Sequence, residues 1–282
     1  MKLLLTGGLG YIGSHTCIEL CQSGYQVVLI DNLSNSSMET LERINTLVSN
    51  NVTFYNIDIR DQMSLEDLFN RHVFDGVIHF AGLKSVNKSI SNPIDYYSNN
   101  VCGTVILIEV MKKFGCKTFI FSSSATVYGE PKSVPISEDF PLSSLNPYGH
   151  SKLIIEDLLK NICDSDSAWS IAILRYFNPI GAHKSGMIGE NPIGLPNNLM
   201  PYISQVAIGK REKLYIFGDN FKTSDGTGVR DYIHVMDVVD GHISAFKAIR
   251  DNNKLLILNL GTGKGYSVLE VVSAFENASG KK

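Results

Sequence analysis

Short apolar runs alternate with longer amphipathic stretches through the first half of the chain. The apolar runs are rich in branched and aromatic residues and apolar at consecutive positions, which is typical of strands covered on both faces. They occupy Leu3 to Leu5, Val27 to Ile30, Val52 to Tyr55, Val77 to Phe80 and Thr118 to Phe121. The stretches between them are long enough for helices, at Ser14 to Ser23, Met38 to Ser49, Ser64 to Arg71 and Val101 to Phe114. This order predicts a parallel sheet with right-handed crossovers.

The second half continues the pattern and then interrupts it. A helix is predicted over Tyr148 to Cys163 and a strand over Ile171 to Tyr176. Prolines and glycines then crowd into residues 179–201, which predicts a long loop of the kind that is usually functional or disordered. Regular pattern resumes with a helix over Val235 to Arg250, a strand over Leu255 to Asn259 and a helix over Ser267 to Ala278.

Composition narrows the class of protein. The chain has 282 residues, of which 44% are hydrophobic and 19% charged, so it can bury a large core and is neither disordered nor fibrous. This length predicts one large domain, or one domain with a lobe. The 25 basic and 28 acidic residues give a formal charge of −3, without a basic block that could follow a nucleic acid. No apolar run approaches the roughly 18 residues that span a membrane.

The cysteines indicate a reducing compartment. They are five in number and form no C-x-x-C pair, which argues against a disulfide framework or a zinc site. Cys17 and Cys21 lie one helical turn apart and could share a metal, but buried small side chains are the favoured interpretation. The sequence therefore predicts a cytoplasmic protein with no metal, nucleic-acid or membrane partner.

A glycine-rich turn follows the first predicted strand. Gly7, Gly10 and Gly13 are spaced three residues apart and lead into a predicted helix. A backbone without Cβ atoms lets a pyrophosphate approach the amides of the helix N-terminus, where the helix dipole favours negative charge. A purely structural tight turn is the alternative, but the strand–turn–helix context favours dinucleotide binding.

Acidic residues end the next two strands. Asp31 lies 18 residues after Gly13, where a carboxylate accepts hydrogen bonds from ribose hydroxyls and repels a 2′-phosphate. This position predicts NAD rather than NADP. Asp58 is placed to meet the adenine amino group, although an ordinary turn residue at a strand end fits its position nearly as well.

Tyr148 and Lys152 are four residues apart and therefore lie on one face of the predicted helix. A free tyrosine has a pKa of about 10 and is a poor base at neutral pH. A lysine ammonium one turn away, together with a positive nicotinamide ring, lowers that pKa, so that the phenolate can take a hydroxyl proton. Ser124 follows the fifth strand, at the edge where open parallel sheets bind ligands, and could hydrogen-bond the reacting oxygen.

Longer segments support a family resemblance. They are Thr6 to Thr16 (TGGLGYIGSHT), Asp31 to Leu33 (DNL), Val77 to Lys84 (VIHFAGLK), Phe121 to Gly129 (FSSSATVYG), Leu174 to Gly181 (LRYFNPIG), Pro196 to Tyr202 (PNNLMPY) and Asp225 to Asp237 (DGTGVRDYIHVMD). Together they resemble the extended short-chain dehydrogenase/reductase family, and within it the UDP-glucose 4-epimerases, essentially from end to end. The resemblance implies an α/β fold, a Rossmann-type doubly wound parallel sheet with a smaller C-terminal substrate-binding lobe.

The resemblance also implies roles for individual residues. It gives the catalytic role to Ser124, Tyr148 and Lys152. Its NAD contacts are Gly7, Gly10, Tyr11, Ile12, Gly13, Asp31, Asn32, Asp58, Ile59, Phe80, Ala81, Lys84, Asn99, Tyr148, Lys152 and Phe177. Its nucleotide-sugar contacts are Ser124, Asn178, Asn198, Leu199, Phe217 and Arg230. The guanidinium of Arg230 suits a diphosphate. His150 departs from the lysine of many relatives and points off the Tyr148 face.

The implied reaction is the interconversion of UDP-glucose and UDP-galactose in galactose metabolism. Tyr148 removes the proton of the sugar 4-hydroxyl while hydride passes to NAD. The resulting 4-keto sugar turns and takes hydride back on its other face. A nucleotide-sugar 4,6-dehydratase or decarboxylase is one alternative, but the acid that dehydratases carry just after the serine is replaced by Ala125 and Thr126.

A second alternative is an NAD-binding protein or fragment without catalysis. Family members continue beyond the position of Lys282, so we expect the lobe to be incomplete at its C-terminal end and to lack some UDP contacts. The predicted division is an NAD-binding domain over residues 1–177, to which residues of about 231–260 return, and a lobe over 178–282. The resemblance also implies a homodimer formed through Asn92 to Phe114 and Tyr148 to Cys163.

Overall fold

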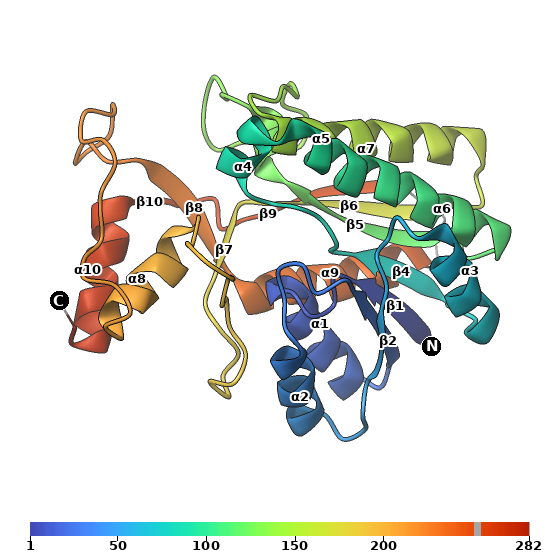
Figure 1. Cartoon of the computed structure of the whole chain (residues 1–282). Coiled ribbons are helices and arrows are strands. Elements are labelled where there is room, and N and C mark those ends of the chain that lie inside the picture. Colours follow the sequence, from blue (N-terminus) through green and yellow to red (C-terminus); the bar gives the residue numbers. More distant parts are fainter. Residues whose placement is uncertain (251–254, 282) are drawn as a thin grey trace.

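A seven-stranded parallel sheet forms the centre of the computed structural model, which describes residues 1–250 and 255–281 (Figure 1). Its strands stand in the order β3-β2-β1-β4-β5-β6-β9. They are β1 (Lys2–Thr6), β2 (Gln26–Asp31), β3 (Thr53–Asn56), β4 (Gly76–His79), β5 (Thr118–Ser124), β6 (Ser170–Tyr176) and β9 (Leu255–Leu260). Each of them overlaps one of the predicted strands. The predicted Rossmann-type doubly wound sheet is confirmed.

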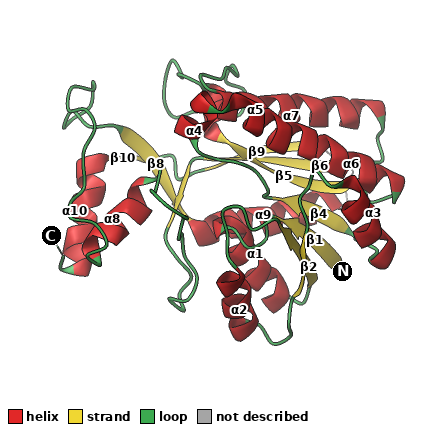
Figure 2. Ribbon diagram, viewed as in Figure 1, coloured by secondary structure: helices red, strands yellow, loops and turns green. Residues whose placement is uncertain are grey.

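Helices cover both faces of this sheet (Figure 2). One face carries α1 (Tyr11–Gln22), α2 (Met38–Leu47) and α9 (Val235–Arg250), and the other carries α3 (Gln62–Arg71), α6 (Gly103–Lys113) and α7 (Pro147–Ser165). Within β1, Leu3 and Leu5 pack into the first core while Leu4 packs into the second. This alternation explains why consecutive strand positions are apolar. Cys17 is fully buried in the first core, as the favoured interpretation of that residue expected.

A smaller sheet and two helices form the part of the molecule beside the carboxyl ends of the main strands (Figure 1). Its strands are β7 (Asn178–Ile180), β8 (Val229–His234) and β10 (Gly265–Ser267), and its helices are α8 (Leu199–Ala207) and α10 (Val268–Ser279). Strand β8 pairs parallel to β7 and antiparallel to β10. The loop predicted over 179–201 is therefore wrong at both of its ends, where Asn178 begins β7 and Leu199 begins α8.

The helical segment before β5 is longer than predicted. It runs through α4 (Val86–Ser91), α5 (Pro93–Tyr96) and a π-helical turn (Tyr97–Cys102) before α6. The turn contains the buried Asn100, whose side chain accepts from the backbone N–H of Leu83 at 2.8 Å and donates to its carbonyl oxygen at 3.1 Å. Single π-helical turns inside α-helices occur frequently at functional sites, and this one fixes the segment that follows β4.

A second short helical turn follows β5, over Ala125–Tyr128. Further along, α9 and β9 return to the main sheet, and β9 pairs with β6. Within residues 1–250 and 255–281, no helix is long and apolar enough to cross a membrane.

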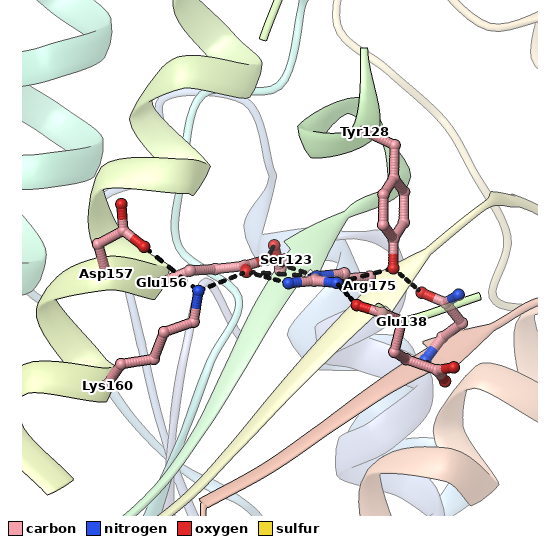
Figure 3. A network of polar contacts seen from close by, with 8 residues as sticks. Ser123, Tyr128, Glu138, Glu156, Asp157, Lys160 and Arg175 are labelled. Carbon is pink, nitrogen blue, oxygen red and sulfur yellow. Dashed lines mark hydrogen bonds and ion pairs between the residues drawn. The ribbon is translucent and has the colours of Figure 1, made fainter. Parts of the chain in front are cut away.

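A buried ion pair joins α7 to β6 (Figure 3). Arg175 is 1% exposed and Glu156 is fully buried. The guanidinium donates from Nε to Glu156 Oε1 at 3.0 Å and from Nη2 to Oε2 at 2.6 Å. Ser123, at the end of β5, donates to the same Oε1 at 2.6 Å. The carboxylate and the guanidinium therefore fix three elements at the carboxyl edge of the sheet.

The same guanidinium reaches the segment between β5 and α7. Its Nη1 donates to the Tyr128 hydroxyl at 2.7 Å and to the Glu138 carbonyl oxygen at 3.1 Å. Tyr128 in turn donates to Asn259 of β9 at 2.6 Å. Such a fully satisfied buried network rigidifies the elements that it connects.

Removing one partner of this pair is expected to destabilise the fold strongly. Glu156→Ala leaves the Arg175 guanidinium buried without its carboxylate, and we expect a loss of about 3–5 kcal/mol in the free energy of unfolding. Asp157→Ala is the matched control, because Asp157 is the next residue on α7 and forms an exposed ion pair with Lys160, of a kind worth about 0–1 kcal/mol. Urea unfolding followed by circular dichroism measures both. Equal losses in the two variants would contradict the role given to the buried pair.

Candidate active site

A cleft of about 2460 Å³ lies between the carboxyl ends of the main strands and the smaller sheet. It is lined by all of the residues predicted for the site except Asp58 and Phe217. The lining set is Gly7, Gly10, Tyr11, Ile12, Gly13, Asp31, Asn32, Ile59, Phe80, Ala81, Lys84, Asn99, Ser124, Tyr148, Lys152, Phe177, Asn178, Asn198, Leu199 and Arg230. The fold thus brings together residues that are far apart in the sequence.

The glycine turn between β1 and α1 has the shape of a dinucleotide cradle. Gly7 has φ +64°, and a Cβ there would lie 2.7 Å from the backbone nitrogen of Ala81. A Cβ on Gly13 would lie 2.4 Å from the carbonyl oxygen of Gly7. No side chain caps the start of α1, and its first turn carries no acidic residue. The amides of that turn therefore face the cleft in a form that suits a pyrophosphate.

Asp31 joins this turn to the loop after β2. It is 6% exposed, and its carboxylate accepts from the backbone N–H of Leu9 at 3.1 Å, the N–H of Leu33 at 2.9 Å and the Ser36 hydroxyl at 2.7 Å. A carboxylate has about four acceptor sites, so three internal bonds leave capacity for a ribose hydroxyl. Asp31 thus holds the turn and can also meet a cofactor.

The Asp58 carboxylate forms its hydrogen bonds with other residues of the protein in this structure. Its carboxylate accepts from the guanidinium of Arg60 at 2.7 Å and from the amide of Asn32 at 2.9 Å. The bond from Arg60 is the main reason why its pKa lies well below the usual range. Its neighbours Ile57 and Ile59 line the cleft and Asp58 does not, which matches the turn-residue interpretation better than the adenine contact.

The three predicted catalytic residues meet where β5 and α7 adjoin. Ser124 is the last residue of β5, and Tyr148 lies in the first turn of α7, four residues before Lys152. Asn146 fixes the start of this helix, because its side chain accepts from the backbone N–H of Gly149 at 2.9 Å. The Lys152 ammonium lies 6.0 Å from the Tyr148 ring centroid and donates to the Ser122 carbonyl oxygen at 2.7 Å.

Burial dominates the electrostatics of these side chains. It lowers the pKa of Lys152 to about 8, against the opposing effect of the Glu156 carboxylate. Burial also raises the pKa of Tyr148, and the hydrogen bond with Ser124 offsets this only in part. The predicted lowering of this pKa required a positive nicotinamide ring as well as Lys152, and in the protein without that ring burial is the larger effect. In the protein alone burial therefore favours the protonated phenol, and positive charge beside the ring favours the phenolate.

Several contacts of cleft residues were not predicted from the sequence. The Thr126 hydroxyl donates to Ser124 Oγ at 2.9 Å, and the Tyr11 hydroxyl donates to the Gly181 carbonyl oxygen at 2.7 Å. Tyr176 lines the cleft and is hydrogen-bonded to the buried His242. Thr126 lies inside the quoted FSSSATVYG segment and could have been found there, whereas the pairing of Tyr176 with His242 spans 66 residues and has no local signal.

The predicted nucleotide-sugar contacts come from the smaller sheet and its surroundings. Asn178 begins β7 and donates from its amide to the Asp231 carbonyl oxygen at 3.0 Å, and Arg230 lies on β8. Asn198 directly precedes α8. Phe217 is 87% exposed and lies outside the cleft lining, so the described structure does not bring it to the other contacts.

Comparison with known proteins identifies the family. Residues 3–261 match the NAD dependent epimerase/dehydratase family. The chain is 55% identical over its whole length to a UDP-glucose 4-epimerase of Bacillus subtilis, of which it covers 83%, and 54% identical to that of Mus musculus, also with 83% coverage. The UDP-glucose 4-epimerase of Bifidobacterium longum, solved in complex with NAD+ and UDP, superposes with a TM-score of 0.97 at 49% identity. That match covers 100% of this chain and 84% of the other.

These similarities extend over the glycine turn, the Tyr148 helix and the smaller sheet alike. The chain belongs to the NAD dependent epimerase/dehydratase family and, within it, to the UDP-glucose 4-epimerases.

Proposed function

We propose that this protein interconverts UDP-glucose and UDP-galactose with NAD as its cofactor. The observation that carries the proposal is the meeting of Tyr148, Lys152 and Ser124 with the glycine turn in one cleft. Relatives with 54–55% identity over the whole chain are UDP-glucose 4-epimerases, and the solved relative from Bifidobacterium longum holds NAD+ and UDP.

The three catalytic side chains divide the work at the sugar 4-hydroxyl. Tyr148 takes the hydroxyl proton when the alcohol is oxidised and returns it when the ketone is reduced. Lys152 supplies a fixed positive charge beside the phenol, and Ser124 hydrogen-bonds the reacting oxygen. When bound, NAD supplies hydride acceptance and return at the sugar C4. Because burial raises the pKa of the phenol, positive charge brought into the cleft favours its activation.

Inversion requires that the sugar turns while the nucleotide stays fixed. We propose that Arg230, Asn178 and Asn198 hold the nucleotide in place. The guanidinium of Arg230 matches a diphosphate in charge and geometry. The 4-keto sugar then presents its other face before the alcohol is restored. Elimination of the 6-hydroxyl would need an acid after Ser124, and Ala125 and Thr126 provide none, which disfavours a dehydratase or decarboxylase.

The setting of the enzyme belongs to the same proposal. We assign residues 1–177 with α9 and β9 to an NAD-binding domain, and the rest of 178–282 to a substrate-binding lobe. We further propose a homodimer through the helical segment Asn92 to Phe114 and α7, supported by the exposed Ile94 on the first of these. We also propose a role in galactose metabolism and a cytoplasmic location.

A direct product assay tests the activity. Purified protein is incubated with UDP-galactose and NAD, and UDP-glucose is separated from UDP-galactose by chromatography and quantified, while NADH is followed by its absorbance. We expect product without net accumulation of NADH. A protein that binds neither NAD nor UDP would overturn the proposal. NADH formed without product would indicate an abortive reaction.

Tyr148→Phe is expected to lower kcat by about 100-fold or more, because the general base is removed and the ring that packs in the cleft is kept. NAD affinity should remain within about twofold of the wild type by the same reasoning. Steady-state kinetics and NAD titration measure the two quantities. Unchanged turnover would refute the role of Tyr148.

Lys152→Met is expected to move the pH dependence of kcat/KM. Loss of a positive charge near the phenol raises the pKa of Tyr148, so the acidic limb of the profile should move to higher pH by about one unit or more. The matched control is Lys113→Met, because Lys113 lies on α6 outside the cleft lining and pairs with Glu66 on α3. An acidic limb that stays in place in Lys152→Met contradicts the electrostatic role.

Asp31→Asn is expected to weaken NAD binding and to reduce the preference for NAD over NADP, each by about tenfold, equal to about 1.4 kcal/mol. The charge that repels a 2′-phosphate is lost, and so is an acceptor for the turn amides. Calorimetric titration with both dinucleotides measures the change, with Asp61→Asn at the start of α3 as the control. The idea fails if the ratio of the two affinities is unaltered.

A further inference from the structure

Glu190 occupies a central position in the cleft that neither the sequence motifs nor the proposed roles explain. Its side chain is 8% exposed, and it lies on the segment between β7 and α8. One oxygen, Oε1, accepts from the Lys84 ammonium at 2.7 Å and from the Asn198 side-chain amide at 2.8 Å. All three residues line the cleft. A single carboxylate oxygen therefore joins a residue on the cofactor side to a residue on the sugar-nucleotide side.

A second contact runs beside this one. The Tyr11 hydroxyl, in the first turn of α1, donates to the Gly181 carbonyl oxygen at 2.7 Å. Burial and the negative charge of Glu190 both raise the pKa of Tyr11, so the carboxylate lies close enough to act on the phenol. The helix that begins at the glycine turn is thus connected to the segment that carries Glu190.

The physical chemistry of this position is unusual. A carboxylate in a cleft lined for phosphate groups is unfavourable unless a cation compensates it, and Lys84 is that cation. A lysine ammonium has three N–H donors, and Glu190 takes one of them. Two remain for a cofactor, while the direction of the side chain is set. In the same way, one N–H of Asn198 is fixed and its carbonyl oxygen stays available.

We propose that Glu190 is a positioning residue that couples the two halves of the site. This inference rests on the proposed function. By holding Lys84 and Asn198 on one oxygen, the carboxylate pre-organises the nucleotide-sugar contact and retains the cofactor contact, without touching the reacting atoms. Binding at either half then stabilises the arrangement that the other half needs.

The test uses Glu190→Gln and Glu190→Ala in the full chain with NAD present. Hydrogen bonds to charged groups are worth enough that Glu190→Ala should raise the KM for UDP-galactose about tenfold or more, with kcat within about threefold of the wild type. NAD should dissociate faster by a similar factor. Glu190→Gln keeps an acceptor oxygen and loses the charge, so its KM should fall between those of the wild type and the alanine variant.

The chain offers a closely matched control in Glu66→Gln. Glu66 lies on α3 outside the cleft lining and also accepts from a lysine, Lys113, at 2.7 Å and from an amide, Gln62, at 3.0 Å. Loss of an ordinary ion pair should therefore leave the KM and NAD release unchanged. An equal rise in KM in Glu66→Gln would overturn the proposal, as would an unchanged KM in both Glu190 variants or a loss confined to kcat.

A double mutant separates positioning from a direct contact with substrate. If Glu190 acts through Asn198, then Glu190→Ala combined with Asn198→Ala should raise KM by less than the product of the two single effects. Multiplicative effects would contradict the coupling. UDP titration and NAD release are also measured without turnover. An inactive wild type would therefore sink the proposed function, and these two readouts would still decide the role of Glu190.

Discussion

Parallel strands deliver their carboxyl ends to one edge of the sheet, and the rest of this structure depends on that constraint. The glycine turn after β1, Asp31 at the end of β2, Ser124 at the end of β5 and Phe177 after β6 meet there although they are up to 170 residues apart. Helices on both faces cover the strands, and the central strands are buried along almost their whole length, so the chemistry is confined to this edge. The smaller sheet closes the cleft from the outside and brings the residues that can hold a sugar nucleotide.

A buried ion pair keeps this edge of the sheet rigid, although burying charged groups is energetically unfavourable. The Arg175–Glu156 pair is buried between β6 and α7, and its bonds to Ser123 and Tyr128 extend it to the turn after β5 (Figure 3). Lys152 lies one helical turn before Glu156 and is also buried, which lowers its pKa to about 8. Helix α7 thus carries two buried charged residues on neighbouring turns, Glu156 in the ion pair that stabilises the fold and Lys152 in the proposed catalytic group. The same burial raises the pKa of the Tyr148 phenol.

Local patterns in the sequence predicted the main sheet well because most of its strands are buried on both faces and its helices are amphipathic. The glycine turn and the four-residue spacing of Tyr148 and Lys152 could also be predicted, because each depends on residues close together in the chain. The smaller sheet was missed because β7 and β10 span three residues each and are fixed by pairing with β8 rather than by their own composition.

Contacts between residues far apart in the sequence could not be predicted either, because no local pattern indicates them. Lys84 and Glu190 are 106 residues apart, and nothing near either residue indicates the other. The direction of the Tyr148 pKa shift likewise depends on burial that only the folded chain creates.

The proposed reaction requires that hydride leaves and returns to the same sugar carbon within one cleft. UDP-galactose carrying deuterium at C4 tests this most directly, with the product analysed by NMR. We expect UDP-glucose with the deuterium still on C4 and no uptake of solvent hydrogen at that carbon. UDP-glucose that has lost the label, or a product that carries it on another carbon, would contradict it.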